Sequence, residues 1–346
     1  MTILVARVSR TRSIPPILRR ALPRRETALD SRCNPFSTCV PRKRAGSYQT
    51  QVKKSSSSDP RIEDAGRAIE DDYALIREKY ATPKNPIVLA HGLFGFDEFR
   101  LAGSLLPGVQ YWRGITQAMR ANGIEVITTC VPASASIEER AAKLGEDIAA
   151  KANGKSVNII AHSMGGLDAR YMVSRLQPDN VDVLSLTTIA TPHRGSAFAD
   201  YCFEEIGPHY LPRIYNFFNH WGISTGAFSQ LTRKYMCEEF NTKVLDAAGV
   251  RYFSYGATSN PHLFSVFKHP HSILAKLEGP NDGLVSVASA KWGTYKGTLV
   301  GVSHLDLINW TNRLRWFASR VAGIDRKFNA IAFYLDIADM LAKEGL

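Results

Sequence analysis

The 346-residue sequence predicts an α/β fold, a mostly parallel, doubly wound sheet with helices on both faces. Three observations indicate this class. Short apolar runs alternate with amphipathic helical segments, Asn-Gly pairs end two of those segments, and no internal repeat is present. Alternation at this pitch predicts right-handed βαβ units, whose strands are buried on both faces.

The predicted elements begin after a serine-rich hinge at 55–60. A helix with many charges and few apolar anchors is predicted over 61–80. Strands are then predicted at 87–90, 124–129, 157–161 and 183–189, and helices at 111–121, 137–152 and 165–175.

Residues 198–246 interrupt the alternation with many aromatic residues, and they are predicted to form short helices. Such an insertion is either a helical lid, placed at about 205–246, or a helical excursion of the core. Strands are predicted again at 252–255 and 297–302. The apolar face of the last helix, 328–341, is predicted to pack on the core rather than on a membrane.

The net charge of +11 lies entirely in the N-terminal segment. Residues 1–58 contain 13 Arg and Lys residues and two acidic residues, so the remainder, residues 59–346, has no net charge and no basic surface excess that would indicate nucleic-acid binding. An Arg-rich, acid-poor leader, disordered or cleaved, predicts mitochondrial import. The alternatives are a plain tail on a cytoplasmic protein, and secretion. No run approaches the length of a transmembrane segment.

The cysteines have neither C-x-x-C pairs nor metal-ligand spacing. Cys130, Cys202 and Cys237 lie beyond the leader, and an odd number fits a reducing compartment. They are interpreted as small apolar fillers, with a Cys202–Cys237 bridge as the alternative.

Residues 161–166 read AHSMGG and have the pattern of a nucleophile elbow. They follow a β-branched run and precede a helical segment, as a serine raised on a tight strand-to-helix turn requires. Ala161 stands where the usual G-x-S-x-G pattern has its first glycine. The pattern therefore predicts Ser163 as a nucleophile, and a small-residue turn without catalytic function is the alternative.

A serine nucleophile needs a base, and the base needs an orienting acid. Asp282 lies in a Gly/Pro/Asn turn before an apolar segment, and His304 lies in the loop after a predicted strand. The order Ser163, Asp282, His304 is that of α/β-hydrolases. The oxyanion donors are predicted to be the backbone amides of Met164 and Leu93, the latter between two glycines in the segment HGLFG at 91–95.

Five motifs make residues 86–310 resemble the lipases of the α/β-hydrolase superfamily, both bacterial true lipases and mitochondrial fungal triacylglycerol lipases. They are HGLFG at 91–95, AHSMGGL at 161–167 with Arg170 and Tyr171, IATPHRGS at 189–196, NDGLV at 281–285 and HLDLIN at 304–309. The resemblance implies an α/β-hydrolase fold, the triad and oxyanion donors named above, and hydrolysis of long-chain acylglycerols under a helical lid.

The resemblance also implies transient contact with a lipid interface and no cofactor. Bacterial relatives carry a structural calcium ion near the catalytic histidine. Asp306 matches one of its ligands, but Trp310 stands where a side-chain oxygen is expected, so no metal is predicted. The alternatives are a phospholipase or acyltransferase with the same triad, and a non-catalytic lipid-binding protein of the same fold.

Overall fold

The computed structural model describes residues 66–70, 72–93, 111–133, 135–204, 225–261, 265, 267–310 and 328–346. All of them belong to one compact unit, Lys53–Leu346. The predicted leader at 1–58 and residues 205–224 of the predicted lid lie outside the described residues.

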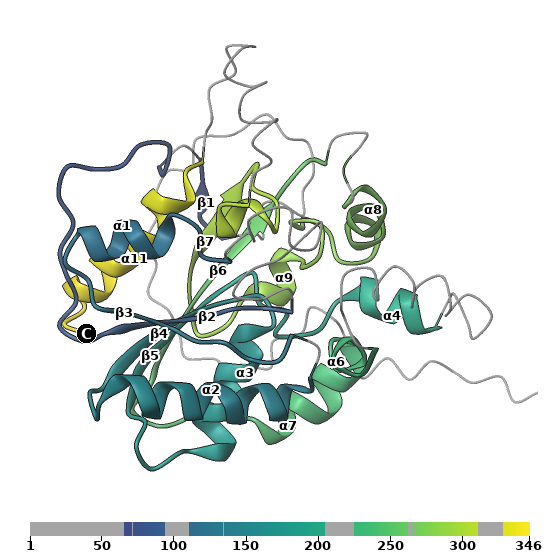
Figure 1. The fold of residues 1–346 in the computed structure, drawn as a ribbon. Helices are drawn as coiled ribbons and strands as arrows, with labels where there is room; N and C mark the ends of the chain where they lie inside the picture. Colours follow the sequence, from purple (N-terminus) through teal and green to yellow (C-terminus); the bar gives the residue numbers. More distant parts are fainter. Residues whose placement is uncertain are drawn as a thin grey trace, which may run out of the picture. The chain divides into compact units, whose positions relative to one another are not determined.

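The described residues form a seven-stranded sheet in the order β1-β7-β6-β5-β4-β2-β3 (Figure 1). Every pair of neighbouring strands is parallel, so the prediction of a mostly parallel sheet is confirmed. The strands are β1 (Ala68–Ile69), β2 (Ile87–Ala90), β3 (Val126–Thr128), β4 (Val157–His162), β5 (Val183–Ile189), β6 (Arg251–Thr258) and β7 (Thr294–Val300).

Helices cover both faces of this sheet. Those described are α1 (Ile115–Ala121), α2 (Ile137–Ala152), α3 (Gly165–Tyr171), α4 (Ala197–Glu204), α6 (Thr225–Ser229), α7 (Asn241–Lys243), α8 (Lys268–Leu277), α9 (Val287–Ala290) and α11 (Ala330–Lys343), with π-helical turns η3 (Met172–Leu176) and η4 (Tyr235–Phe240) and a 3₁₀ turn η5 (Asp306–Ile308). In Figure 1, α1 and α11 lie on one side of the sheet, and α2 and α3 on the other.

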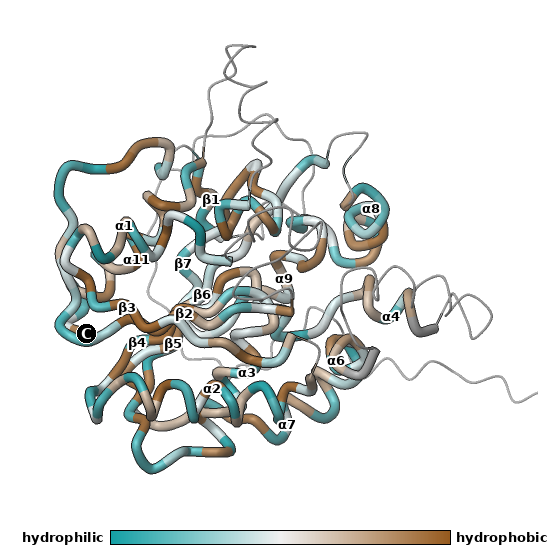
Figure 2. Tube along the Cα trace, in the orientation of Figure 1, coloured by the Kyte–Doolittle hydropathy of each residue, from teal (hydrophilic) through white to brown (hydrophobic). Residues whose placement is uncertain are grey.

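Alternate side chains of β2 pack into two apolar clusters, one on each face of the sheet. Ile87 and Leu89 belong to the apolar cluster that α1 and α11 complete, whereas Val88 and Ala90 belong to the cluster beneath α2 and α3. All four side chains are buried, as the period-2 geometry of a strand covered on both faces requires. Figure 2 shows the corresponding apolar colouring along the central strands.

The predicted bounds of β2, β5 and α2 are confirmed. Helix α2 begins at a capping box, in which Ser136 and Glu139 satisfy each other's backbone amides, and it ends at Asn153 in the left-handed conformation. The last helix packs on the core as predicted, with Leu335, Ile337 and Leu341 buried.

The helix predicted over 61–80 is wrong for the described residues of that range. Ala68 and Ile69 form the edge strand β1, which pairs with Thr298 and Leu299 of β7. Ile69 and Tyr73 of this segment pack on distant parts of the fold, Tyr73 against the C-terminal helix, whereas Leu75 and Ile76 are exposed.

Candidate active site

Ser163 occupies a sharp turn between β4 and α3, and its φ angle is +56°. This left-handed conformation is uncommon for a residue with a side chain, so surrounding contacts must hold it. The Ser163 amide donates to the Ile189 carbonyl at 2.9 Å. The hydroxyl of Thr191 donates to the Ser163 carbonyl at 2.7 Å. The end of β5 thus fixes the turn on both sides of the serine.

Three glycines leave the room that this turn needs. A Cβ atom on Gly92 would lie 2.8 Å from the Ser163 Cβ, and one on Gly165 would lie 2.6 Å from the His91 carbonyl oxygen. A Cβ on Gly166 would lie 2.7 Å from the Thr191 Cγ2. These separations are shorter than van der Waals contact, so a side chain at Gly92 or Gly165 would displace the elbow from the loop after β2, and one at Gly166 would displace it from Thr191 after β5.

The structure brings Asp282 and His304 together, as predicted. His304 Nδ1 lies 2.7 Å from Asp282 Oδ2, and both side chains are buried. An ionised carboxylate only accepts hydrogen bonds, so Nδ1 is the donor and Nε2 is left to accept a proton. The other oxygen of Asp282 accepts from the amides of Leu284 and Val285 at 3.0 and 2.8 Å. These bonds fix the direction of the carboxylate.

His304 also faces the elbow. Its ring centroid lies 4.5 Å from that of His162, the residue before Ser163. Among the described residues, no hydrogen bond joins the Ser163 hydroxyl to His304. Such bonds are often long without substrate and shorten when it binds.

The two predicted oxyanion residues are Met164 in the elbow and Leu93 in the loop after β2; both are buried and belong to one apolar cluster. Neither backbone amide donates to an acceptor within the described part of the chain. Two unpaired amides beside a nucleophile are what an oxyanion requires.

The loop that carries Leu93 is fastened through its two preceding residues. Arg140 Nη2 donates to the His91 carbonyl at 2.9 Å, and the Val131 amide donates to His91 Nε2 at 3.1 Å. The Gly92 amide donates to the Tyr111 hydroxyl at 3.0 Å. The loop is therefore held in place before any substrate binds.

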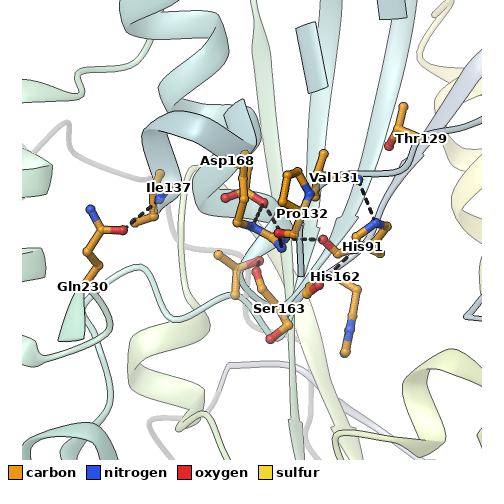
Figure 3. A network of polar contacts seen from close by, with 12 residues as sticks. His91, Thr129, Val131, Pro132, Ile137, His162, Ser163, Asp168 and Gln230 are labelled. Atoms are coloured by element: carbon orange, nitrogen blue, oxygen red, sulfur yellow. Dashed lines mark hydrogen bonds and ion pairs between the residues drawn. The ribbon is translucent and has the colours of Figure 1, made fainter. Parts of the chain in front are cut away.

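Arg140 connects this loop to the helix that follows Ser163. Figure 3 shows its labelled partners His91, Pro132 and Asp168. Its guanidinium is fully buried, contacts Asp168 Oδ2 through Nε at 2.9 Å and Nη2 at 2.7 Å, and donates to the Pro132 carbonyl at 2.9 Å. Burial raises the pKa of Asp168 to about 6, and the charge of Arg140 offsets part of that effect.

Sequence reasoning missed Arg140 and Tyr111. The signal for Arg140 was an arginine on the apolar stripe of its helix, between the buried residues Ile137 and Leu144. A buried arginine needs acceptors, so that position indicates a polar partner inside the fold.

Asp306 has another use than the one considered from the sequence. Its Oδ2 accepts from the amide and the hydroxyl of Ser303, at 3.1 and 2.6 Å, and so closes the turn that carries His304. Among the described residues, no group of three or more His, Cys, Asp or Glu side chains is arranged to hold a metal ion.

Cys202 and Cys237 do not form a disulfide bond. Cys202 is a buried thiol whose pKa burial raises to about 12, consistent with its interpretation as an apolar filler. The described helices include none with the length and apolarity to span a bilayer.

Comparison with known proteins gives consistent results. A family model described as a PGAP1-like alpha/beta domain matches residues 119–206. Triacylglycerol lipase 2 of Saccharomyces cerevisiae is 38% identical over 323 residues, which cover 79% of this chain and 96% of the relative. A triacylglycerol lipase of Vibrio cholerae is 40% identical over 131 residues, 37% of this chain and 39% of the relative.

Among solved structures, a metagenomic carboxyl esterase superposes with a TM-score of 0.59 at 20% identity, covering 78% of this chain and 79% of that one. This likeness shows the α/β-hydrolase fold.

Proposed function

The chain belongs to the triacylglycerol lipase family of α/β-hydrolases, and from this premise we propose that it hydrolyses the carboxylic ester bonds of triacylglycerols through an acyl-enzyme on Ser163. One observation carries the proposal for the site: Ser163, at positive φ, directly follows His162, whose ring packs against His304 of a hydrogen-bonded Asp282–His304 pair. That arrangement supplies a nucleophile, a base and an orienting acid.

In the first half-reaction, Ser163 Oγ bonds to the ester carbonyl carbon while His304 Nε2 takes the hydroxyl proton. The carbonyl π electrons move onto oxygen, and the amides of Leu93 and Met164 stabilise the resulting oxyanion. Asp282 remains ionised and stabilises the imidazolium. When the intermediate collapses, the carbon–oxygen bond to the glyceryl group breaks, and His304 gives its proton to the departing alcohol.

In the second half-reaction, water attacks the acyl-enzyme as His304 takes one of its protons. The second tetrahedral intermediate collapses, the bond to Ser163 Oγ breaks, and His304 returns the proton to the serine. The products are one fatty acid and one diacylglycerol. Each oxyanion amide contributes about 10²–10³-fold to turnover in sites of this kind.

We also propose that the segment at about 205–246 is a lid and that transient contact with a lipid interface opens it. The support comes from its described part, where Phe228 and Met236 share an apolar cluster with Leu93 and Met164. Aromatic and apolar residues at this place would be exposed to lipid when the segment moves.

The Arg-rich composition of residues 1–58 supports mitochondrial import, which we propose as the destination of the protein. A fluorescent fusion of residues 1–60 that remained diffuse in the cytosol would contradict it.

The catalytic proposal is tested with wild type, Ser163→Ala and the matched control Ser272→Ala, whose exposed hydroxyl donates to the backbone carbonyl of His269. The three proteins are assayed on a triacylglycerol emulsion, on phosphatidylcholine vesicles and on short- and long-chain p-nitrophenyl esters. We expect fatty acid release from the emulsion by wild type and Ser272→Ala, and a loss of at least about 10³-fold in Ser163→Ala.

Equal rates in wild type and Ser163→Ala would leave only a lipid-binding protein. Release from phosphatidylcholine but not from the emulsion would make the enzyme a phospholipase instead.

A further inference from the structure

Tyr111 and His162 form a buried hydrogen-bonded chain between the two loops of the proposed site. The Tyr111 hydroxyl accepts from the Gly92 amide at 3.0 Å and lies 2.6 Å from His162 Nδ1. The His162 ring then packs against that of His304. Tyr111 precedes α1, whereas His162 ends β4, so the chain joins segments that are far apart in the sequence.

The direction of these bonds follows from the count of donors. The Gly92 amide can only donate, so Tyr111 accepts there and keeps its own proton to give. If His162 Nδ1 also carried a proton, the buried Tyr111 hydroxyl hydrogen would have no acceptor. Donation from Tyr111 to His162 Nδ1 pairs the hydroxyl hydrogen and Nδ1, and among the described residues it leaves only His162 Nε2 without a partner, whereas the reverse direction leaves both the hydroxyl hydrogen and Nε2 unpaired. His162 is therefore neutral and carries its proton on Nε2.

The surroundings of His162 favour this neutral form. The side chain is 1% exposed, and its Nε2 has no hydrogen-bond partner. Burial and then the charge of His304 lower the pKa of His162 well below its usual range, and a backbone interaction with His304 opposes them only in part. A neutral ring at this place does not repel the imidazolium that forms on His304 during catalysis.

Among the described residues, the titratable groups around this hydrogen-bonded pair are His304, His91, Tyr334, Arg140 and Asp168. His304 faces His162, and the ring of His91 lies 5.5 Å from that of Tyr111. The charges of Arg140 and Asp168 act on Tyr111 in opposite directions.

We propose that Tyr111 and His162 are positioning residues of the reaction. Their hydrogen-bonded side chains form a rigid link, here called the strut, that fixes the position of Gly92 in the oxyanion loop relative to His304. The inference rests on the proposed function, because it assigns the strut to the geometry of that reaction. The Tyr111 end fixes the amide next to Leu93. The His162 end packs against the ring of the base, His304.

The chain offers a matched control. Tyr334 lies in the same apolar cluster and is fully buried, and among the described residues its hydroxyl has no hydrogen-bond partner. Tyr111→Phe and Tyr334→Phe therefore each remove one buried hydroxyl group from the same apolar cluster, and only Tyr111→Phe breaks the strut.

With a soluble p-nitrophenyl ester as substrate, we expect Tyr111→Phe to lower kcat about 10- to 100-fold with KM within twofold, because the oxyanion donor and the base are misplaced while substrate binding is kept. Tyr334→Phe is expected to stay within twofold of wild type in both constants. Equal behaviour of the two variants would overturn the proposal while leaving the serine hydrolase function intact.

A second measurement does not depend on activity. In ¹⁵N-histidine-labelled full-length protein, His162, assigned through His162→Asn, is expected in the Nε2–H tautomer near pH 7 and to change in Tyr111→Phe but not in Tyr334→Phe. A protonated Nδ1 in wild type would overturn the inferred direction of the hydrogen bond, and a His162 signal that does not change in Tyr111→Phe would overturn the strut. Failure of wild type to hydrolyse any ester would remove the proposed function, and the tautomer would still decide the hydrogen-bond direction.

Discussion

The buried Arg140–Asp168 pair makes a quantitative prediction about stability. Replacing Arg140 by Met leaves the Asp168 carboxylate buried without a counterion and removes the donor to the carbonyls of His91 and Pro132. Breaking a fully buried pair from one side costs about 3–5 kcal/mol of unfolding free energy. Asp168→Asn leaves the guanidinium without a counterion and is expected to cost a similar amount.

The double replacement removes both charges, so its cost is expected to be smaller than the sum of the two by about 2–3 kcal/mol. Urea unfolding of the full chain, followed by circular dichroism with the m values compared, measures all four corners of the cycle. Activity supplies a second test. Arg140→Met should lose more turnover than Asp168→Asn, because only the former releases the His91 carbonyl. Costs that add within about 0.5 kcal/mol would refute the argument that the pair acts as a unit.

Two further predictions concern the elbow and pH. Gly166→Ala should lower the free energy of unfolding by about 1–3 kcal/mol and reduce turnover, because the added Cβ meets Thr191, whose hydroxyl donates to the Ser163 carbonyl. A Gly166→Ala protein with the urea midpoint and kcat of wild type would contradict this. Burial is the main cause that lowers the pKa of His162 and of His193 well below 6.5 in the folded protein. Below pH 6.5 the unfolded chain therefore binds more protons than the folded one. The free energy of unfolding then falls as pH falls, by up to about 1.4 kcal/mol per pH unit for each histidine. His193→Asn should therefore reduce this slope between pH 6.5 and 5.5, and an unchanged slope would disprove the assignment.

Local signals explain which parts of the fold the sequence predicted. Helix α2 was predicted with its observed bounds because Ser136 and Asn153 are a cap and a stop. Strand β1 was missed because only its pairing with β7 makes a strand of Ala68 and Ile69, and that pairing joins residues about 230 positions apart. Alternating charges around such a short run suggested a helix instead.

The candidate site divides in the same way. Ser163, Asp282 and His304 were predicted because their turns have their own sequence patterns, and the structure pairs the last two. Tyr111 and Arg140 have no such pattern. They act through contacts with the elbow and with the loop after β2, which appear only when the chain has folded. In the sequence they are only members of the helices predicted over 111–121 and 137–152.

The alanine in place of the first glycine of the elbow pattern shows which positions of that pattern require glycine for steric reasons. Ala161 lies within β4, opposite Ala90 of β2, and its side chain is buried in the cluster under α2 and α3. Its φ angle is not positive, so a Cβ atom there meets neither strain nor the turn. On the other side of Ser163, a Cβ on Gly165 would run into the His91 carbonyl. The close approach of the helix to the oxyanion loop therefore demands glycine only after the serine, and the strand before it accepts any small residue.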